Sequence, residues 1–195
     1  MGMDMEIFTE GYLNVDLENP NSAKKWVNLN VDPIDGTRDY DLFYLLAGVR
    51  YNDGEKSYPP IAKAKGLPDD MDNSIRQQND YIIDSGDDNL FYKPSYLTLK
   101  EIKDSGYASI MKIKGWVFED EWQEWLEFPD KTKMFQFYME DEKCPEYLRE
   151  NRILKEWNNY INGNLLYMKN RMEELKEKYN ISSDEEIRIV FWFNF

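Results

Sequence analysis

The sequence predicts an α+β protein in which a mixed β-sheet packs against a long C-terminal helix and a shorter helix near residues 39–49. The C-terminal strand is expected at the centre of the sheet. Three patterns lead to this prediction: alternating apolar and polar residues near the N-terminus, a wholly apolar run at the C-terminus, and a helical repeat just before that run. With 195 residues, 42% of them hydrophobic, the chain can build one sizeable core. We therefore expect a single domain over residues 1–195.

The expected strands lie near the two ends of the chain. Residues 3–13 alternate apolar and polar side chains, as a strand with one buried face does. Residues 25–31 finish in strict alternation, and the Asn-Pro-Asn-Ser turn signal at residues 19–22 joins the two segments, so we expect a hairpin. Residues 187–193 are apolar on both faces from Ile189 onward, which is typical of a central strand covered on both sides.

Two segments carry the helical repeat. Residues 39–49 have apolar side chains at 3.6-residue spacing and end at Gly48. Residues from about 146 to 179 show the stronger repeat, with Gly163 as a candidate bend; its apolar positions are Leu154, Trp157, Ile161, Leu165, Met168, Met172, Leu175 and Tyr179. We expect one long helix there, whose apolar seam could serve a homodimer as well as the core.

The segment at about 51–95 is rich in proline, glycine and aspartate, and we expect a long loop with at most a short helix around residues 73–80. Long loops inside compact domains are uncommon and often functional. Thr98, which has Glu101 three residues later, is expected to cap a helix directly after this segment.

Charge restricts the partners that the chain could bind. Twenty-four Lys and Arg residues stand against 38 Asp and Glu, a formal charge of −14 that repels nucleic-acid backbones and anionic membranes. We expect no direct nucleic-acid binding and no membrane association, although an acidic protein that mimics a nucleic acid stays open. Cys144 is the only cysteine, and no signal peptide or apolar run of about 18 residues is visible, so we expect a cytoplasmic protein.

The residue types restrict the chemistry as well. The chain has no histidine, and no Gly-x-Ser-x-Gly, phosphate-loop or dinucleotide motif. Asp4 and Glu6 lie two residues apart on an expected strand, so their carboxylates share one face and could bind a metal ion for hydrolysis or simply be solvated. We favour the solvated interpretation, assign no catalytic residue, metal or cofactor, and lean away from an enzyme.

Three further groups each have a functional and a structural interpretation. The aspartates between Asp69 and Asp88 lack the spacing of a calcium loop, which favours a solvated acidic loop. The aromatic and acidic run at 116–128 could present an interface, but a core role is favoured. Arg38, Arg50 and Lys65 flank glycine or proline turns and could clamp an anion, although pairing with nearby aspartates is slightly favoured.

Several segments together resemble a family of uncharacterised proteins common in bacteriophage genomes and found in some bacteria. That family opens with Met-Gly-x-Asp-Ile-His, continues through Gly-Val-Arg, Gly-Leu-Pro and His-Ser-His-Ser-Trp motifs, and ends near Arg-Ile-Val-Phe-Trp-Phe. The corresponding segments of this chain are Met1-Gly2-Met3-Asp4-Met5-Glu6, Asp39-Tyr40-Asp41-Leu42-Phe43, Gly48-Val49-Arg50, Pro60-Ile61, Gly66-Leu67-Pro68, Ser95-Tyr96-Leu97-Thr98 and Ile187-Arg188-Ile189-Val190-Phe191-Trp192-Phe193-Asn194. The motifs keep their order over most of the chain.

The departures from the family pattern bear on mechanism. Glu6 replaces the opening histidine of the pattern, and Tyr92 and Pro94 replace its paired histidines. The resemblance implies a phage-type accessory protein, and the lost imidazoles favour binding over catalysis. The candidate ligand-binding residues are Asp4, Glu6, Arg38, Arg50, Gly66, Leu67, Pro68, Tyr92, Ser95 and Tyr96.

The leading hypothesis is a protein that counters a host defence by sequestering a small anionic, nucleotide-like ligand or by docking on a host protein. The first alternative is an acidic mimic of a nucleic acid that inhibits a host nucleic-acid-binding protein. The second is a carboxylate-based, metal-dependent hydrolase that uses Asp4 and Glu6.

Overall fold

The computed structural model describes most of the chain, and every structural statement below refers to that part. The described residues are 2–16, 19, 22–29, 38–50, 58–84, 92–127, 138–139 and 146–194. The expectations placed on residues 51–57, 85–91 and Phe128, and on the end of the second expected strand at residues 30–31, lie outside it.

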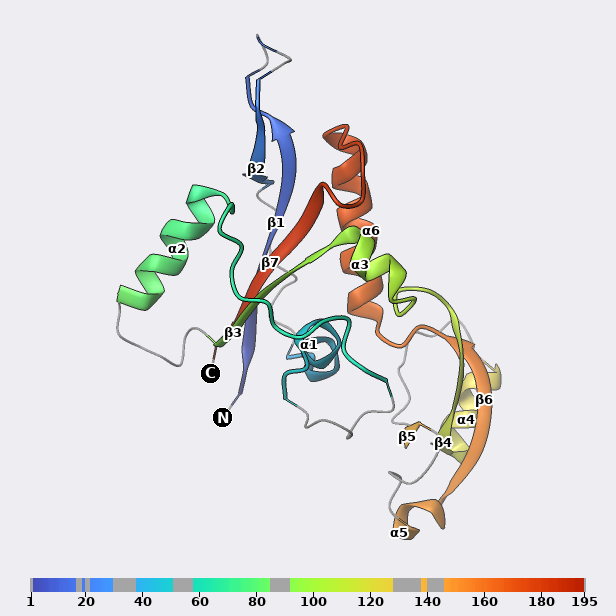
Figure 1. Cartoon of the computed structure of the whole chain (residues 1–195). Coiled ribbons are helices and arrows are strands. Elements are labelled where there is room, and N and C mark those ends of the chain that lie inside the picture. Colours follow the sequence, from blue (N-terminus) through green and yellow to red (C-terminus); the bar gives the residue numbers. More distant parts are fainter. Residues whose placement is uncertain are drawn as a thin grey trace.

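A four-stranded sheet organises the larger part of the fold (Figure 1). It contains β1 (Asp4–Asn14), β2 (Lys24–Asn28), β3 (Tyr92–Thr98) and β7 (Ile187–Asn194) in the order β2-β1-β7-β3. The α+β class, the β1–β2 hairpin and the inner position of the C-terminal strand are confirmed. We expected a mixed sheet, but all described strand pairs of this sheet are antiparallel: β1 pairs with β2 in this way, and β7 runs opposite to both of its neighbours.

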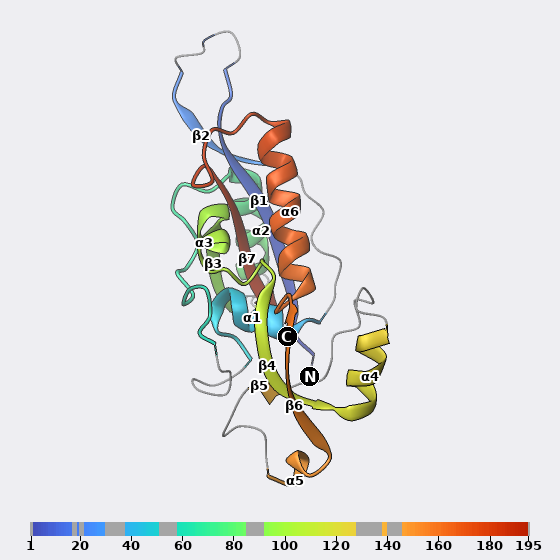
Figure 2. The same ribbon diagram turned by 90° about the vertical axis from the view of Figure 1, so that its right-hand side faces the viewer.

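The two faces of β7 contact different helices, and Figures 1 and 2 show α2 on one side of the sheet and α1, α3 and α6 on the other. These helices are α1 (Tyr40–Ala47), α2 (Asn73–Asp84), α3 (Leu99–Asp104) and α6 (Gly163–Lys178). Ile187, Ile189, Phe191 and Phe193 point into the main core with α1, α3 and α6. Val190 and Trp192, on the opposite face, contact Met71 and Ile75 of the α2 segment. Both faces of β7 are therefore buried, as its apolar sequence predicts.

Capping residues set the ends of the short helices. Asp39 accepts a hydrogen bond from the Leu42 N–H at 2.9 Å, and Gly48 ends α1 with φ of 67°, a conformation that glycine adopts without strain. Thr98 and Glu101 form the expected reciprocal capping box of α3. The predicted helix at 39–49 and the Thr98 cap are confirmed.

Asp39 also joins two helices, so its substitution should have a predictable effect on the free energy of unfolding. Its Oδ2 accepts hydrogen bonds from Asn162 and Asn164, each at 2.8 Å, and Asn162 in turn caps α6 through the Leu165 N–H. Asp39→Ala should lower the free energy of unfolding by about 2 kcal/mol in a urea titration, because it removes a cap and leaves a buried amide unpaired. Asp39→Asn, which keeps a capping oxygen, should lose less. A change within about 0.5 kcal/mol for the alanine variant would contradict this role.

The prediction of a single long helix over residues 146–179 is wrong. The segment forms α5 (Glu146–Arg149), β6 (Arg152–Asn159) and α6. All eight residues of β6 pair with β4 (Met111–Phe118), and Asn162 starts a new helix. Leu154 and Trp157 therefore lie on a strand, with Leu154 at 38% exposure and Trp157 buried, and the continuous seam that could have served a dimer does not exist.

A second, three-stranded antiparallel sheet carries its own core, and Figures 1 and 2 show it beyond the N-terminal end of α6. Its order is β5-β4-β6, with β5 at Tyr138–Met139, and α4 (Glu119–Glu127) follows β4. Trp122 stacks on Trp125 at 5.2 Å and meets Trp157 edge-on at 6.1 Å. These rings form a cluster with Ile113 and Val117, so the core interpretation holds for Trp122.

The loop segment packs along the free side of β3. Lys65 N–H donates to Ser95 Oγ at 3.1 Å, and Gly66 N–H donates to the Pro94 carbonyl at 3.0 Å. The short helix expected around residues 73–80 exists as α2 and continues to Asp84. None of the helices in the described part of the chain combines the length and the apolar composition of a membrane span.

Candidate functional site

Two arginines and a tyrosine gather where β1 begins. The guanidinium carbon of Arg50 lies 4.5 Å from the centre of the Tyr40 ring, within cation–π range. Arg38 Nε lies 3.2 Å from Asp4 Oδ1, and a Cβ placed at Gly2 would collide with the Arg38 guanidinium. We call these five residues the N-terminal cation cluster. It is built by the first residues of β1 and by the two ends of α1.

The electrostatics of the N-terminal cation cluster favour negative charge. A hydrogen bond from Arg50, together with the charges of Arg50 and Arg38, lowers the pKa of the Tyr40 hydroxyl below its usual range. The same positive potential would stabilise an anionic ligand. Arg38 keeps the aspartate partner that the structural interpretation favoured, but the pair is exposed, and exposed ion pairs stabilise little. Exchanging that carboxylate for a ligand anion therefore costs little.

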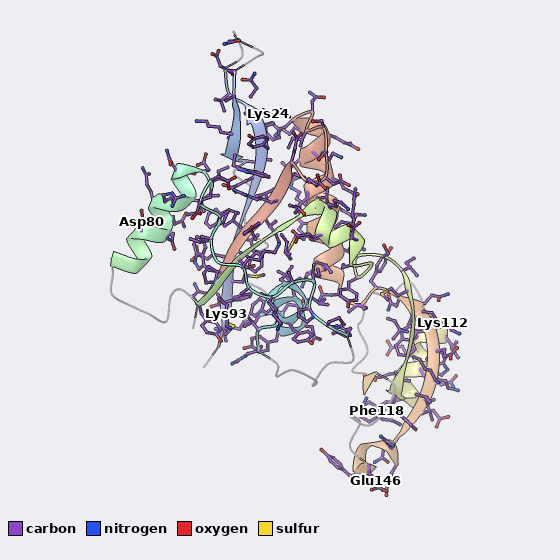
Figure 3. The ribbon with its side chains drawn as sticks, viewed as in Figure 1. Lys24, Asp80, Lys93, Lys112, Phe118 and Glu146 are labelled. Atoms are coloured by element: carbon purple, nitrogen blue, oxygen red, sulfur yellow. The ribbon has the colours of Figure 1, made fainter. Side chains whose placement is uncertain are left out.

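Backbone strain marks the same end of the sheet. Arg50 has φ of 82° and Lys93 has φ of 49°, both in the left-handed region that non-glycine residues rarely adopt. Lys93 follows Tyr92, which is opposite Phe193 at the end of β7, and Figure 3 shows Lys93 at the end of β3. Such strain tends to persist at ligand sites.

Glu6 lies on the face of β1 that α2 covers. Gln78 of α2 and Asn194 of β7 each place an amide nitrogen 3.5 Å from a Glu6 carboxylate oxygen. Burial raises the pKa of Glu6 above its usual range. Asp4 is exposed whereas Glu6 is half-buried, so the solvated interpretation applies to Asp4 only. No group of three His, Cys, Asp or Glu side chains that could hold a metal occurs among the described residues.

The remaining candidate residues lie along β3 and the loop beside it. Ser95 is fully buried and accepts its hydrogen bond from Lys65. Leu67 and Tyr96 pack on the cluster of Met71, Ile75, Val190 and Trp192, and Lys65 lies 4.6 Å above the Tyr96 ring. Gly66 and Pro68 shape this loop: Gly66 has φ of 82°, and the Pro68 carbonyl accepts the Met71 N–H. These residues hold the sheet edge in place, whereas Asp4, Glu6, Arg38, Arg50 and Tyr92 gather at the sheet end.

Residues that sequence reasoning missed complete this sheet end. Gln78 and Asn79 belong to no motif, whereas Tyr40 and Asn194 occur only within longer family-like segments that give them no role of their own. The polar Asn-Ser and Gln-Gln-Asn residues of α2, on either side of Ile75 and Arg76, were the available signal.

A buried ion pair lies on the same sheet face but serves the fold. Arg188 Nε is 2.7 Å from Glu10 Oε2, and both side chains are almost fully buried. The Asp72 N–H donates to Glu10 at 2.6 Å, and Arg188 lies 3.8 Å above the Trp26 ring. Arg188 Nη2 is 2.9 Å from Asp70 Oδ1, an ion-pair contact without hydrogen-bond geometry. The Asp70 carboxylate thus contacts Arg188, and the Asp72 carboxylate accepts hydrogen bonds from the N–H and the hydroxyl of Ser74, so these two aspartates are not simply solvated.

A hollow of about 700 Å³ opens between α3 and the end of α6, away from the cation cluster. Its lysines are already paired: Lys103 with Glu173 and Asp184, and Lys176 with Asp184. Both lysines are therefore already neutralised by carboxylates, which makes the hollow a poor site for an anionic ligand.

Comparisons of this chain with protein-family models, with curated proteins and with solved structures found no match.

Proposed function

We propose that the protein is a phage-type accessory protein that binds and sequesters a small anionic, nucleotide-like ligand, and thereby counters a host defence. The observation that carries the proposal is the Arg50 guanidinium over the Tyr40 ring, with Arg38 at the start of β1 adding to the positive potential at the Tyr40 hydroxyl. In a chain of net charge −14, a local group of cations that lowers the pKa of a phenol is a specific feature. Guanidinium groups bind phosphate oxygens in a bidentate manner, and a tyrosine ring offers a flat apolar surface beside them.

The groups at the sheet end support binding rather than turnover. General acid–base catalysis near neutral pH most often uses histidine, which this chain lacks. A guanidinium and an exposed carboxylate hold charge without transferring protons at that pH. The hydrolase alternative has no third acidic neighbour for Asp4 and Glu6 among the described residues to support it.

Calorimetric titration with mononucleotides, dinucleotides and cyclic nucleotides tests the proposal. At least one of these ligands should release or absorb heat, and Arg50→Met should weaken its binding about tenfold or more, because a hydrogen bond to a charged group contributes about 1.5–3 kcal/mol. The protein should carry no N-terminal tag, since Gly2 packs against Arg38.

Lys112→Met is the matched control, because Lys112 is an exposed lysine on the other sheet, paired with Glu156. It should bind like the parent protein. Absence of heat with every nucleotide would overturn the proposal, and so would an equal loss of affinity in the Lys112 and Arg50 variants.

The nucleic-acid mimic remains a second candidate because of α4. Its acids are Glu119, Asp120, Glu121, Glu124 and Glu127, and it contains no basic residue. A contiguous acidic helix of this kind fits a basic protein surface. If mimicry is the function, neutralising Asp120, Glu124 and Glu127 together should abolish the capture of basic host proteins, whereas Arg50→Met should leave that capture unchanged.

A further inference from the structure

Three polar side chains between α2 and the sheet have unused hydrogen-bonding capacity. Asn79 is 5% exposed, and its Oδ1 has no hydrogen-bond partner among the described residues. The Oδ1 of Asn194 is buried and likewise unpaired there. From the described residues, the Glu6 carboxylate receives side-chain hydrogen bonds only at 3.5 Å, the weak limit of such contacts. Buried polar atoms in folded proteins are nearly always paired, so unpaired ones call for a ligand or a water.

The register of α2 on the sheet brings these three side chains together. Ser74 bonds Asn28, which is opposite Glu10, while Gln78 reaches Glu6, so α2 runs antiparallel to β1 toward its beginning. Ile75 packs on Val190 and Trp192. Asn79 lies four residues further and therefore on the same helix face, one turn closer to that end.

The unused atoms all accept hydrogen bonds. A carboxylate and two amide oxygens require a donor, and the partner that satisfies them is an N–H group. Burial raises the pKa of Glu6 above its usual range, which agrees with a carboxylate that its surroundings stabilise poorly.

We propose that Glu6, Asn79 and Asn194 recognise the exocyclic amino group of a nucleobase, and so select amino-bearing nucleotides. The inference rests on the proposed function and deepens it. Asp4 and Glu6 project from the same face of β1 about 7 Å apart, and Asp4 contacts Arg38. One nucleotide can thus place its phosphate at the N-terminal cation cluster and its base under the end of α2.

Matched nucleotides test the selection. Guanosine and inosine monophosphate differ by one amino group, adenosine and inosine monophosphate differ at position 6 of the ring, and cytidine and uridine monophosphate differ at position 4. We expect at least one amino-bearing member to bind about tenfold or more tightly than its partner. Asn79→Leu should abolish that preference and leave the phosphate-dependent affinity in place. Asn194→Leu provides a second variant should Asn79→Leu fold poorly.

Two outcomes separate this inference from the function it rests on. Equal binding within every pair, still weakened by Arg50→Met, would overturn the amino-group site and leave anion binding intact. If no nucleotide binds, the nucleosides test the site alone: the ¹³C resonance of the Glu6 carboxyl should shift with adenosine, guanosine or cytidine, and not with inosine. No shift with any of them would overturn the inference.

Discussion

Glu10→Ala should lower the free energy of unfolding by about 3–5 kcal/mol, the largest effect that we expect from a single polar substitution. Arg188 is 4% exposed and would lose the one fully buried anionic partner that it has among the described residues. Asp70, the other carboxylate near its guanidinium, is 64% exposed in its side chain and lies outside hydrogen-bond geometry. The Asp72 N–H would lose its acceptor as well. Urea unfolding followed by tryptophan fluorescence measures the loss.

Three variants separate the buried charge from the packing around it. Glu10→Gln keeps the shape and one accepting oxygen, so it should lose less than Glu10→Ala. The pair Glu10→Leu with Arg188→Met should recover much of the loss, because it removes both charges from the interior. A loss below about 1 kcal/mol for Glu10→Ala would show that water reaches Arg188 and that the Glu10–Arg188 pair contributes little to the stability of the fold.

Trp157→Ala should cost about 3–5 kcal/mol, the usual range for truncating a buried tryptophan. Trp157 is 4% exposed and meets Trp122 in a small cluster with four buried members among the described residues. That cluster shares no residue with the main core, so we expect the loss to be concentrated in the three-stranded sheet. Hydrogen exchange should accelerate in β4 and β6 while β1 and β7 stay protected.

Tyr167→Ala is the control for this truncation, since Tyr167 is 58% exposed on α6 and should change stability by less than about 0.5 kcal/mol. Equal acceleration of hydrogen exchange in both sheets after Trp157→Ala would contradict a loss of stability confined to the three-stranded sheet. It would instead support the prediction that residues 1–195 form one cooperative domain.

Local patterns were sufficient for the elements whose partners lie close in sequence or whose burial is complete. The alternation at residues 3–13 predicted β1, the apolar run at 187–193 predicted an inner strand, and Gly48 and Thr98 marked helix ends. Each depends on side chains within one or two turns, or on a strand covered on both faces. The missing histidine, likewise, is a property of composition and restricts the chemistry wherever the residues lie.

The tertiary structure decided what local spacing leaves ambiguous. Leu154 and Trp157 are three residues apart, which suits a helix, yet pairing with β4 makes them part of a strand. Glu6, Asn79 and Asn194 come together because α2 crosses β1 and β7 with one particular register. This arrangement is non-local, and motifs in α2 alone do not encode it. The sequence alone thus determined the α+β class, the central strand and a chemistry without imidazole. Long-range packing alone decided which arginines, amides and carboxylates meet at the sheet end, because only the folded chain brings β1, α1, α2 and β7 together.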